Sequence, residues 1–150
     1  KNLRENQTQC PETTRILKQV PNLFQAFFSV LEGGKSILSH HGPYMGYLRY
    51  HLGLIVPEND PPSIKILDEV YTWQEGESMI FDDTLKHEVI NYSTDIRVVL
   101  IVDILRPMPL IPHLINWFTT RFLIKNVYGK TVIKNLNSFK RKQALQEEPA

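Results

Sequence analysis

Side chains that can bind metals and carboxylates gather in three short stretches of this 150-residue chain. They are His40, His41 and His51 around Arg49, then His87, and finally Arg97 at the start of a long apolar run. Neutral imidazole is a common ligand of redox-active divalent metals, and guanidinium binds carboxylates through two parallel hydrogen bonds. The pattern therefore favours a metal site, with iron(II) as the leading candidate.

Residues 46–56 have the alternation of an extended strand, on which successive side chains point to opposite faces. Leucines dominate one face, which we expect to form part of the core. Arg49 and His51 share the other face. Two interpretations of that face stay open: it is exposed to solvent, or it is buried around an anionic or metallic group.

Charged groups in the later stretches raise similar questions. Asp82 and Asp83 precede His87, and because neighbouring strand residues point to opposite faces, both carboxylates cannot easily bind one metal. We expect them to form a turn or to orient His87. Arg97 is a lone cation in the apolar strand 96–105, and a buried guanidinium needs an anionic partner, either a protein side chain or a bound carboxylate.

The chain before Pro109 contains many short segments of strand-like composition, separated by turns rich in Gly and Pro, and no long helical pattern. The expected strands are residues 25–31, 35–39, 46–56, 63–67, 70–73, 78–81 and 96–105, after a short helix over residues 14–20. This succession favours an all-β core folded as a double-sheet jelly roll, with a metal site at the mouth between the sheets. We expect that domain to span residues 1–108, and a basic amphipathic helical tail to span residues 109–150.

Length and composition suit one globular domain with a sizeable core. The single Cys10 excludes an internal disulfide and favours a reducing compartment. The chain starts at Lys1 without a charged and then apolar leader, which argues against a secretory signal and is consistent with a piece of a longer protein.

The net charge of +1 hides an uneven distribution. Residues 1–103 carry nine basic and fourteen acidic side chains, whereas residues 104–146 carry eight basic and no acidic ones. Apolar side chains recur at helical spacing in that basic segment, namely Ile111, Leu114, Ile115, Phe118, Phe122 and Leu123. We expect residues 110–142 to lie on an anionic membrane surface.

Packing of this helix on the domain's own sheet, with its lysines in solvent, is the other interpretation that stays open. Nucleic-acid binding is disfavoured, because the basic residues are interleaved with apolar ones and form no stacking platform. No apolar run reaches the roughly 20 residues that span a bilayer.

Four segments, in this order and spacing, resemble the aspartyl/asparaginyl β-hydroxylase family of iron(II)- and 2-oxoglutarate-dependent oxygenases. They are FFSVLEGG, SHHGPYMGYLRYHLGL, TWQEGESMIFDDTLKHEV and RVVLIVDILRP. The resemblance covers residues 10–108, and several dispersed motifs in register make it specific. It implies a double-stranded β-helix, the cupin-like jelly roll, that uses Fe(II) with 2-oxoglutarate and O₂ as co-substrates.

The resemblance also implies a role for each matching residue. These are His40 and His87 for the iron, Arg49 and His51 for the end of 2-oxoglutarate near the iron, and Arg97 with Ser29 for its distal carboxylate. Gly42 stands where many oxygenases of this kind carry a carboxylate ligand. The resemblance implies that this family works without it, with water at that position.

The activity that the resemblance implies is hydroxylation of an unactivated C–H bond. The tail, in which LRPMP leads into INWF, is more similar to the bacterial branch that hydroxylates an acyl chain of lipid A. That similarity implies an anionic glycolipid substrate and a place on the cytoplasmic side of the bacterial inner membrane. A peptidyl aspartate or asparagine β-hydroxylase is the alternative, and a catalytically silent membrane-associated binding module is a second one.

Overall fold

The computed structural model describes residues 2–124 of the chain. The chain divides into two compact units, Lys1–Arg106 and Pro107–Ala150, and each is described by itself. The basic part of the tail that was predicted to lie on a membrane, from Lys125 to Lys142, falls outside the described residues.

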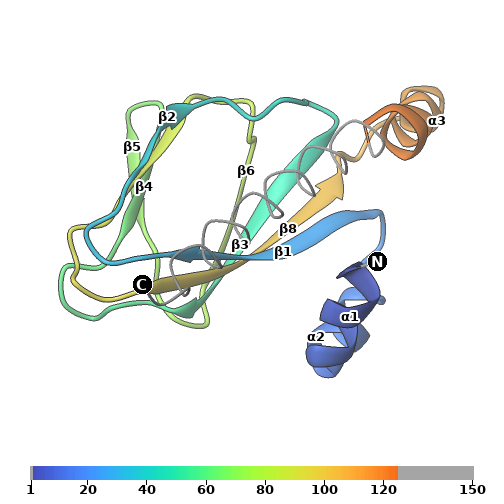
Figure 1. Cartoon of the computed structure of the whole chain (residues 1–150). Helices are drawn as coiled ribbons and strands as arrows, with labels where there is room; N and C mark the ends of the chain where they lie inside the picture. Colours follow the sequence, from blue (N-terminus) through green and yellow to red (C-terminus); the bar gives the residue numbers. More distant parts are fainter. Residues whose placement is uncertain (1, 125–150) are drawn as a thin grey trace, which may run out of the picture. The chain divides into compact units, whose positions relative to one another are not determined.

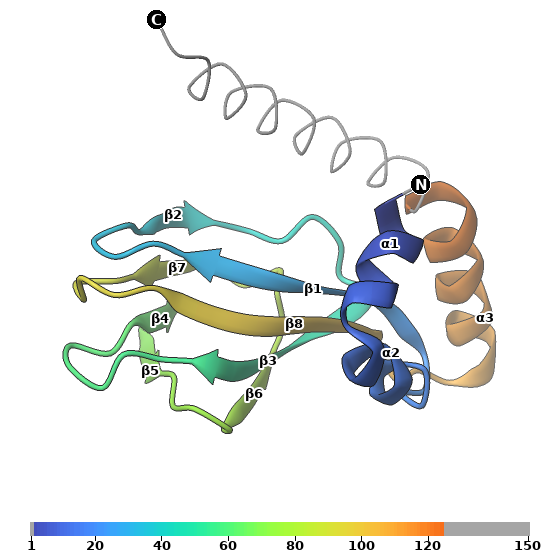
Figure 2. The same cartoon turned by 60° about the horizontal axis from the view of Figure 1, so that its bottom comes forward.

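Within the described residues, the first unit holds two four-stranded antiparallel sheets (Figure 1). The strands are β1 (Leu23–Leu31), β2 (Ile37–His40), β3 (Tyr47–Ile55), β4 (Ser63–Ile66), β5 (Glu69–Thr72), β6 (Ser78–Phe81), β7 (His87–Ile90) and β8 (Arg97–Leu105). One sheet has the order β1-β8-β3-β6 and the other the order β2-β7-β4-β5. Figure 2 shows β1, β8 and β3 side by side in the first of these sheets. Because β1 pairs with β8 and β2 with β7, the chain winds as a jelly roll, and the predicted fold is confirmed.

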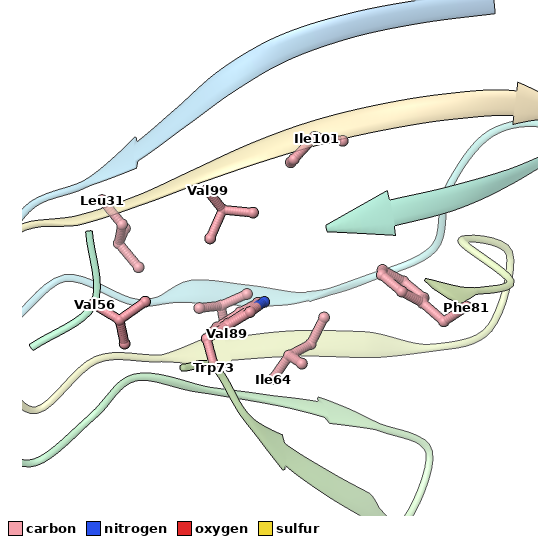
Figure 3. Close-up of a cluster of buried hydrophobic side chains, with 8 residues drawn as sticks. All are labelled: Leu31, Val56, Ile64, Trp73, Phe81, Val89, Val99 and Ile101. Carbon is pink, nitrogen blue, oxygen red and sulfur yellow. The ribbon is translucent and has the colours of Figure 1, made fainter. Parts of the chain in front are cut away.

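The core lies between the two sheets, where apolar side chains of both meet (Figure 3). Ile64 and Val89 come from one sheet, and Val99 and Ile101 from the other. The remaining members of the buried cluster are Leu31, Val56, Trp73 and Phe81. Alternate residues of β8 point into this space, as the period of two along a strand requires.

The two faces of β3 are the reverse of the expectation. His51 pairs with the core residue Ile101 and is buried, so it shares the inner face with Arg49. Leu48 and Leu52 lie on the outer face and are only partly buried. The prediction that the leucine-rich face forms the core was wrong. Between the sheets, the Arg49 guanidinium meets the carboxylates of Asp83 and Asp103, and the His51 ring packs on Trp73. Of the two interpretations left open for that face, the buried one holds.

Two short helices precede β1, namely α1 (Asn2–Gln9) and α2 (Pro11–Leu17). Pro11 begins α2 at a position where its missing N–H costs no hydrogen bond. The helix expected over residues 14–20 is therefore present but begins and ends earlier. Helix α1 was not predicted, because its sequence NLRENQTQ has almost no apolar residue to show a period.

The described part of the second unit is helical. Helix α3 (Leu110–Phe118) is followed directly by η1 (Thr119–Ile124), a π-helical segment. Among the described residues, no helix has both the length and the apolar character needed to span a bilayer.

Shortening a core side chain tests the packing between the sheets. Ile64 is fully buried, so Ile64→Ala should lower the free energy of unfolding by about 2–5 kcal/mol. Val70→Ala, on the neighbouring strand β5 where Val70 is exposed, is the matched control and should change it by less than about 0.5 kcal/mol. Urea denaturation measures both. Equal losses for the two variants would contradict the assigned faces.

Candidate metal and co-substrate site

His40 and His87 meet across two paired strands of one sheet. They are direct partners in the register of β2 and β7, and their ring centroids are 4.2 Å apart. Each Nδ1 lies close to a backbone carbonyl oxygen, that of Leu38 at 2.8 Å for His40 and that of Leu85 at 2.7 Å for His87. A carbonyl can only accept, so each Nδ1 carries the proton and each Nε2 keeps its lone pair. Both imidazoles are thus prepared to coordinate a metal.

Burial lowers the pKa of His87 and so favours the neutral form that binds metal ions. The next residue along from His40, His41, has a different neighbour: its Nδ1 lies 3.0 Å from the carbonyl oxygen of Thr84. The ring pair with His87 therefore belongs to His40, as the sequence register predicted.

Asp83 ties together the loops that precede and follow these histidines. Its carboxylate is fully buried and accepts a hydrogen bond from the Tyr47 hydroxyl at 3.0 Å, while its backbone oxygen accepts one from the Gly42 N–H at 2.7 Å. Its Oδ1 lies 3.5 Å from Nε2 of His87. Asp82, by contrast, closes a turn by accepting hydrogen bonds from the backbone and hydroxyl of Thr84. Asp82 thus forms a turn, which is one of the two roles suggested for these acids. Asp83 lies beside His87 without a hydrogen bond to it, since the proton of that ring is on Nδ1 and is donated to Leu85, so the suggested orienting role of Asp83 stays a prediction.

Gly42 has no room for a side chain. A Cβ at that position would overlap Oδ2 of Asp83 and press on its backbone oxygen. The space that a metal-binding carboxylate at position 42 would need is therefore taken by the carboxylate of Asp83, which comes from the other loop. No group of three or more His, Cys, Asp and Glu side chains suited to a metal occurs among residues 5–122, where side chains are described.

Arg49 lies between two buried carboxylates. Its Nε and one terminal nitrogen donate to the two oxygens of Asp103 at 2.8 and 3.0 Å, and its other terminal nitrogen donates to Asp83 at 2.5 Å. Gln25 also donates to Asp103, at 2.6 Å. These bonds use three of the five N–H groups of the guanidinium, so two remain for a ligand.

A second group of polar atoms is buried between the sheets without a hydrogen-bond partner in the described part of the protein. It comprises both ring nitrogens of His51, Nε1 of Trp73, and Nε and one terminal nitrogen of Arg97. The Arg97 guanidinium lies over the Trp73 ring at 4.7 Å, and His51 stacks on the same ring at 5.8 Å. A neutral imidazole donates from one nitrogen only, so the donors of this group are one His51 N–H, the Trp73 N–H and N–H groups of Arg97. Buried polar groups are normally satisfied, so these donors fit an anionic ligand that accepts from them.

Burial shifts the pKa of both basic members of this group. It lowers the pKa of Arg97 to about 10. It also lowers the pKa of His51 to about 3, with further contributions from Arg49 and Arg97. Among the described residues, Nε and one terminal nitrogen of Arg97 have no hydrogen-bond partner, so its expected anionic partner stays a prediction.

The register brings a further predicted residue to the same face. Ser29 of β1 pairs with Val99, and the next inward residue, Leu31, pairs with Arg97. Ser29 is therefore a diagonal neighbour of Arg97 on the inner face. Phe81 connects the two halves of the site, because its ring contacts His51 at 5.1 Å and His87 at 5.5 Å, both edge to face.

The structure thus brings Arg97, His51 and Ser29 to one inner face, and His40 with His87 to the facing sheet. Arg49 lies between carboxylates that the sequence analysis did not assign to it. Asp103 was missed, although an acid inside the apolar run IRVVLIVDIL gives the same signal that singled out Arg97. Trp73 gave no signal, because a tryptophan in a strand is ordinary core.

Adding a methyl group at position 42 tests the role of Asp83. Gly42→Ala forces Asp83 to move and should cost about 1–3 kcal/mol of stability, with weaker binding of Co²⁺ or Fe²⁺ at His40 and His87. Met45→Ala changes an exposed residue of the same loop and is the control. Thermal unfolding and metal titration report the two effects. A Gly42→Ala protein as stable and as metal-binding as the control would show that the contact with Asp83 is not needed.

His51 should make the metal-free protein sensitive to acid. Its pKa is about 3 in the folded protein and 6.5 as a reference, so the unfolded chain takes up the proton first. The stability that this difference provides is complete above pH 6.5 and falls as the pH drops toward 3, by as much as about 5 kcal/mol. His51→Leu should flatten that part of the stability curve relative to the exposed-site control His41→Ala. Parallel curves for the two variants would mean that His51 charges freely in the folded state.

Comparison of the sequence with known proteins assigns the chain to a family. The model for aspartyl/asparaginyl β-hydroxylase matches residues 1–107. An ornithine lipid ester-linked acyl 2-hydroxylase of Rhizobium tropici is 40% identical over 139 residues, which are 92% of this chain and 50% of the relative. The human aspartyl/asparaginyl β-hydroxylase is 34% identical over 112 residues, 69% of this chain and 15% of the relative. The chain therefore spans about half the length of the first relative and a small part of the second.

Solved structures show only distant likeness. A predicted oxalate decarboxylase of Thermotoga maritima aligns over 57% of this chain and 69% of its own at a TM-score of 0.47 and 16% identity. The jelly-roll assignment comes from the strand order of the chain itself. The predicted family is confirmed by the sequence comparisons: the chain belongs to the aspartyl/asparaginyl β-hydroxylase family.

Proposed function

We propose that this chain is an Fe(II)- and 2-oxoglutarate-dependent hydroxylase that acts on an acyl chain of a polar membrane lipid. The observation that carries the chemistry is the pairing of two oriented imidazoles with a buried cluster of unsatisfied donors. Two neutral imidazoles suit a divalent iron. A small dicarboxylate suits Arg97, Ser29 and His51, because Arg97 and His51 otherwise leave buried donors without partners.

His40 and His87 would hold the iron, and Arg97 with Ser29 would bind the distal carboxylate of 2-oxoglutarate. When bound, iron(II) supplies the oxidative chemistry, in which O₂ and 2-oxoglutarate give succinate, carbon dioxide and one oxygen atom for a C–H bond. The protein's part is to position the target carbon of the substrate and to exclude water from the site. The Leu85 carbonyl oxygen orients His87, Arg49 keeps two N–H groups that a ligand could use, and the rings of Trp73 and Phe81 pack against His51.

The substrate class is suggested by where the similarities end. A match over 92% of the chain must extend past Pro107 into the tail, and the relative with that match is named as a lipid acyl 2-hydroxylase. The human peptide-type relative matches 69% of the chain, and the family model ends at residue 107. The tail is thus shared with an enzyme named for a lipid. We place an ester-linked acyl chain of an ornithine lipid first, and the lipid A acyl chain suggested by the sequence second.

Substrate assays decide between the classes. The whole chain, loaded with Fe²⁺ and 2-oxoglutarate, should add one oxygen atom to an ornithine lipid or a lipid A precursor, as read by mass spectrometry, and release succinate. Hydroxylation only of an Asp- or Asn-bearing peptide would support the peptide alternative. No turnover of any of these, in a protein that binds metal, would favour the silent binding module. His87→Ala, which removes a proposed iron ligand, is the inactive control.

The co-substrate assignment can be tested separately at Arg97. Removing a buried partner of a carboxylate costs at least about 2 kcal/mol, so Arg97→Ala should raise the 2-oxoglutarate requirement roughly 30-fold or more. Arg15→Ala, which removes an exposed cation of α2, should leave it unchanged. The KM for 2-oxoglutarate is the measurement, with circular dichroism to check folding. A folded Arg97→Ala protein with an unaltered KM would remove Arg97 from this role.

A further inference from the structure

The helical segment after Pro109 exposes its apolar side chains and buries polar ones. Seven large apolar side chains are between 45% and 73% exposed, namely Leu110, Ile111, Leu114, Ile115, Trp117, Phe118 and Phe122. Asn116 and Thr120 are 5% and 3% exposed. A helix that belongs to a water-soluble surface shows the opposite distribution. The segment 110–122 therefore offers an apolar surface in need of a partner.

These side chains form one continuous surface, which we call the apolar arc. Residues 111, 114, 115, 118 and 122 recur at helical spacing, with 110 and 117 at its border. The aromatic members pack on one another, because the Phe122 ring lies 4.6 Å from Phe118 and 6.4 Å from Trp117. On the buried side, the Thr120 hydroxyl is satisfied within the helix by the carbonyl oxygen of Asn116 at 2.9 Å.

The charge of the surrounding sequence indicates which partner fits. Residues 104–146 contain eight basic and no acidic side chains. An apolar helical face within a purely basic segment complements the boundary between acyl chains and anionic headgroups of a membrane. Trp117 at the border of the arc has the amphipathic ring that favours this depth. A helix of this kind lies in the membrane surface and does not cross it.

We propose that residues 110–122 dock this protein on an anionic lipid surface, with the apolar arc inserted at the acyl-chain boundary. The proposal rests on the proposed function for its purpose, since an acyl-chain substrate is found in that surface. The enzyme would reach such a substrate by partitioning into the lipid layer that contains it. Turnover would therefore depend on the surface concentration of the lipid.

Vesicle flotation of the whole chain tests the docking directly. Binding should be strong to vesicles containing phosphatidylglycerol, weak to pure phosphatidylcholine, and reduced by high salt. Ile115→Glu and Phe118→Glu should weaken binding at least tenfold, whereas Val70→Glu, an equally exposed apolar site on β5, should not. Brominated lipids should quench wild-type fluorescence, and Trp117→Phe should abolish that quenching because Trp73 is buried.

Two results would overturn the docking proposal. One is equal binding of the Glu variants and the wild type to anionic vesicles. The other is a stable dimer in lipid-free solution, by light scattering, that Phe118→Glu dissociates, because the arc would then be an interface between copies of the chain.

Activity assays separate this proposal from the proposed function. With a short-chain lipid substrate dissolved below its critical micelle concentration, where no surface is present, Ile115→Glu should turn over like the wild type, whereas in anionic vesicles it should lose at least tenfold. Equal turnover in vesicles would overturn the docking and leave the hydroxylase assignment intact. Absence of turnover in both assays, with lipid binding retained, would overturn the function and leave the docking.

Discussion

Buried Asp83 joins the two loops that lie next to the candidate metal ligands on β2 and β7. Its backbone oxygen accepts a hydrogen bond from the Gly42 N–H just after His40, while its carboxylate accepts from the Tyr47 hydroxyl and the Arg49 guanidinium and lies beside Nε2 of His87. These contacts come from the loop after β2, from β3 and from β7, so this one residue holds together the surroundings of the two paired imidazoles. The glycine at position 42 is a consequence: Asp83 already occupies the volume of its side chain.

Ion pairs and ring contacts connect Asp83 and His87 to the interior between the sheets. Arg49 connects Asp83 to Asp103, which lies on the central strand β8, and Phe81 connects His87 to His51. Beyond them lie the unsatisfied donors of His51, Trp73 and Arg97. A buried donor without a hydrogen-bond partner lowers the stability of the folded protein by about 1–3 kcal/mol. Under the proposed function, an anionic co-substrate would be the partner of these donors.

Much of this could be predicted from the sequence, for physical reasons that differ by residue. Short alternating strands and Gly or Pro turns predicted the jelly roll, and the isolated Arg97 in an apolar run predicted a buried cation. The faces of β3 could not be predicted, because hydrophobicity alone assigned the leucines to the core, and only the pairing with β8 shows that Arg49 meets Asp103 inside. Trp73 and Gln25 acquire their roles from neighbours far away in the chain, which no local pattern encodes.

An anaerobic titration of the Fe²⁺-loaded protein with 2-oxoglutarate tests most directly whether the two imidazoles and the buried donors serve one site. In the wild type we expect a weak visible charge-transfer band that saturates with one co-substrate per iron, and in His87→Ala we expect no band. A folded, iron-loaded wild type that gives no band would contradict that expectation, because the oriented imidazoles and the buried donors would then not act on the same ligand.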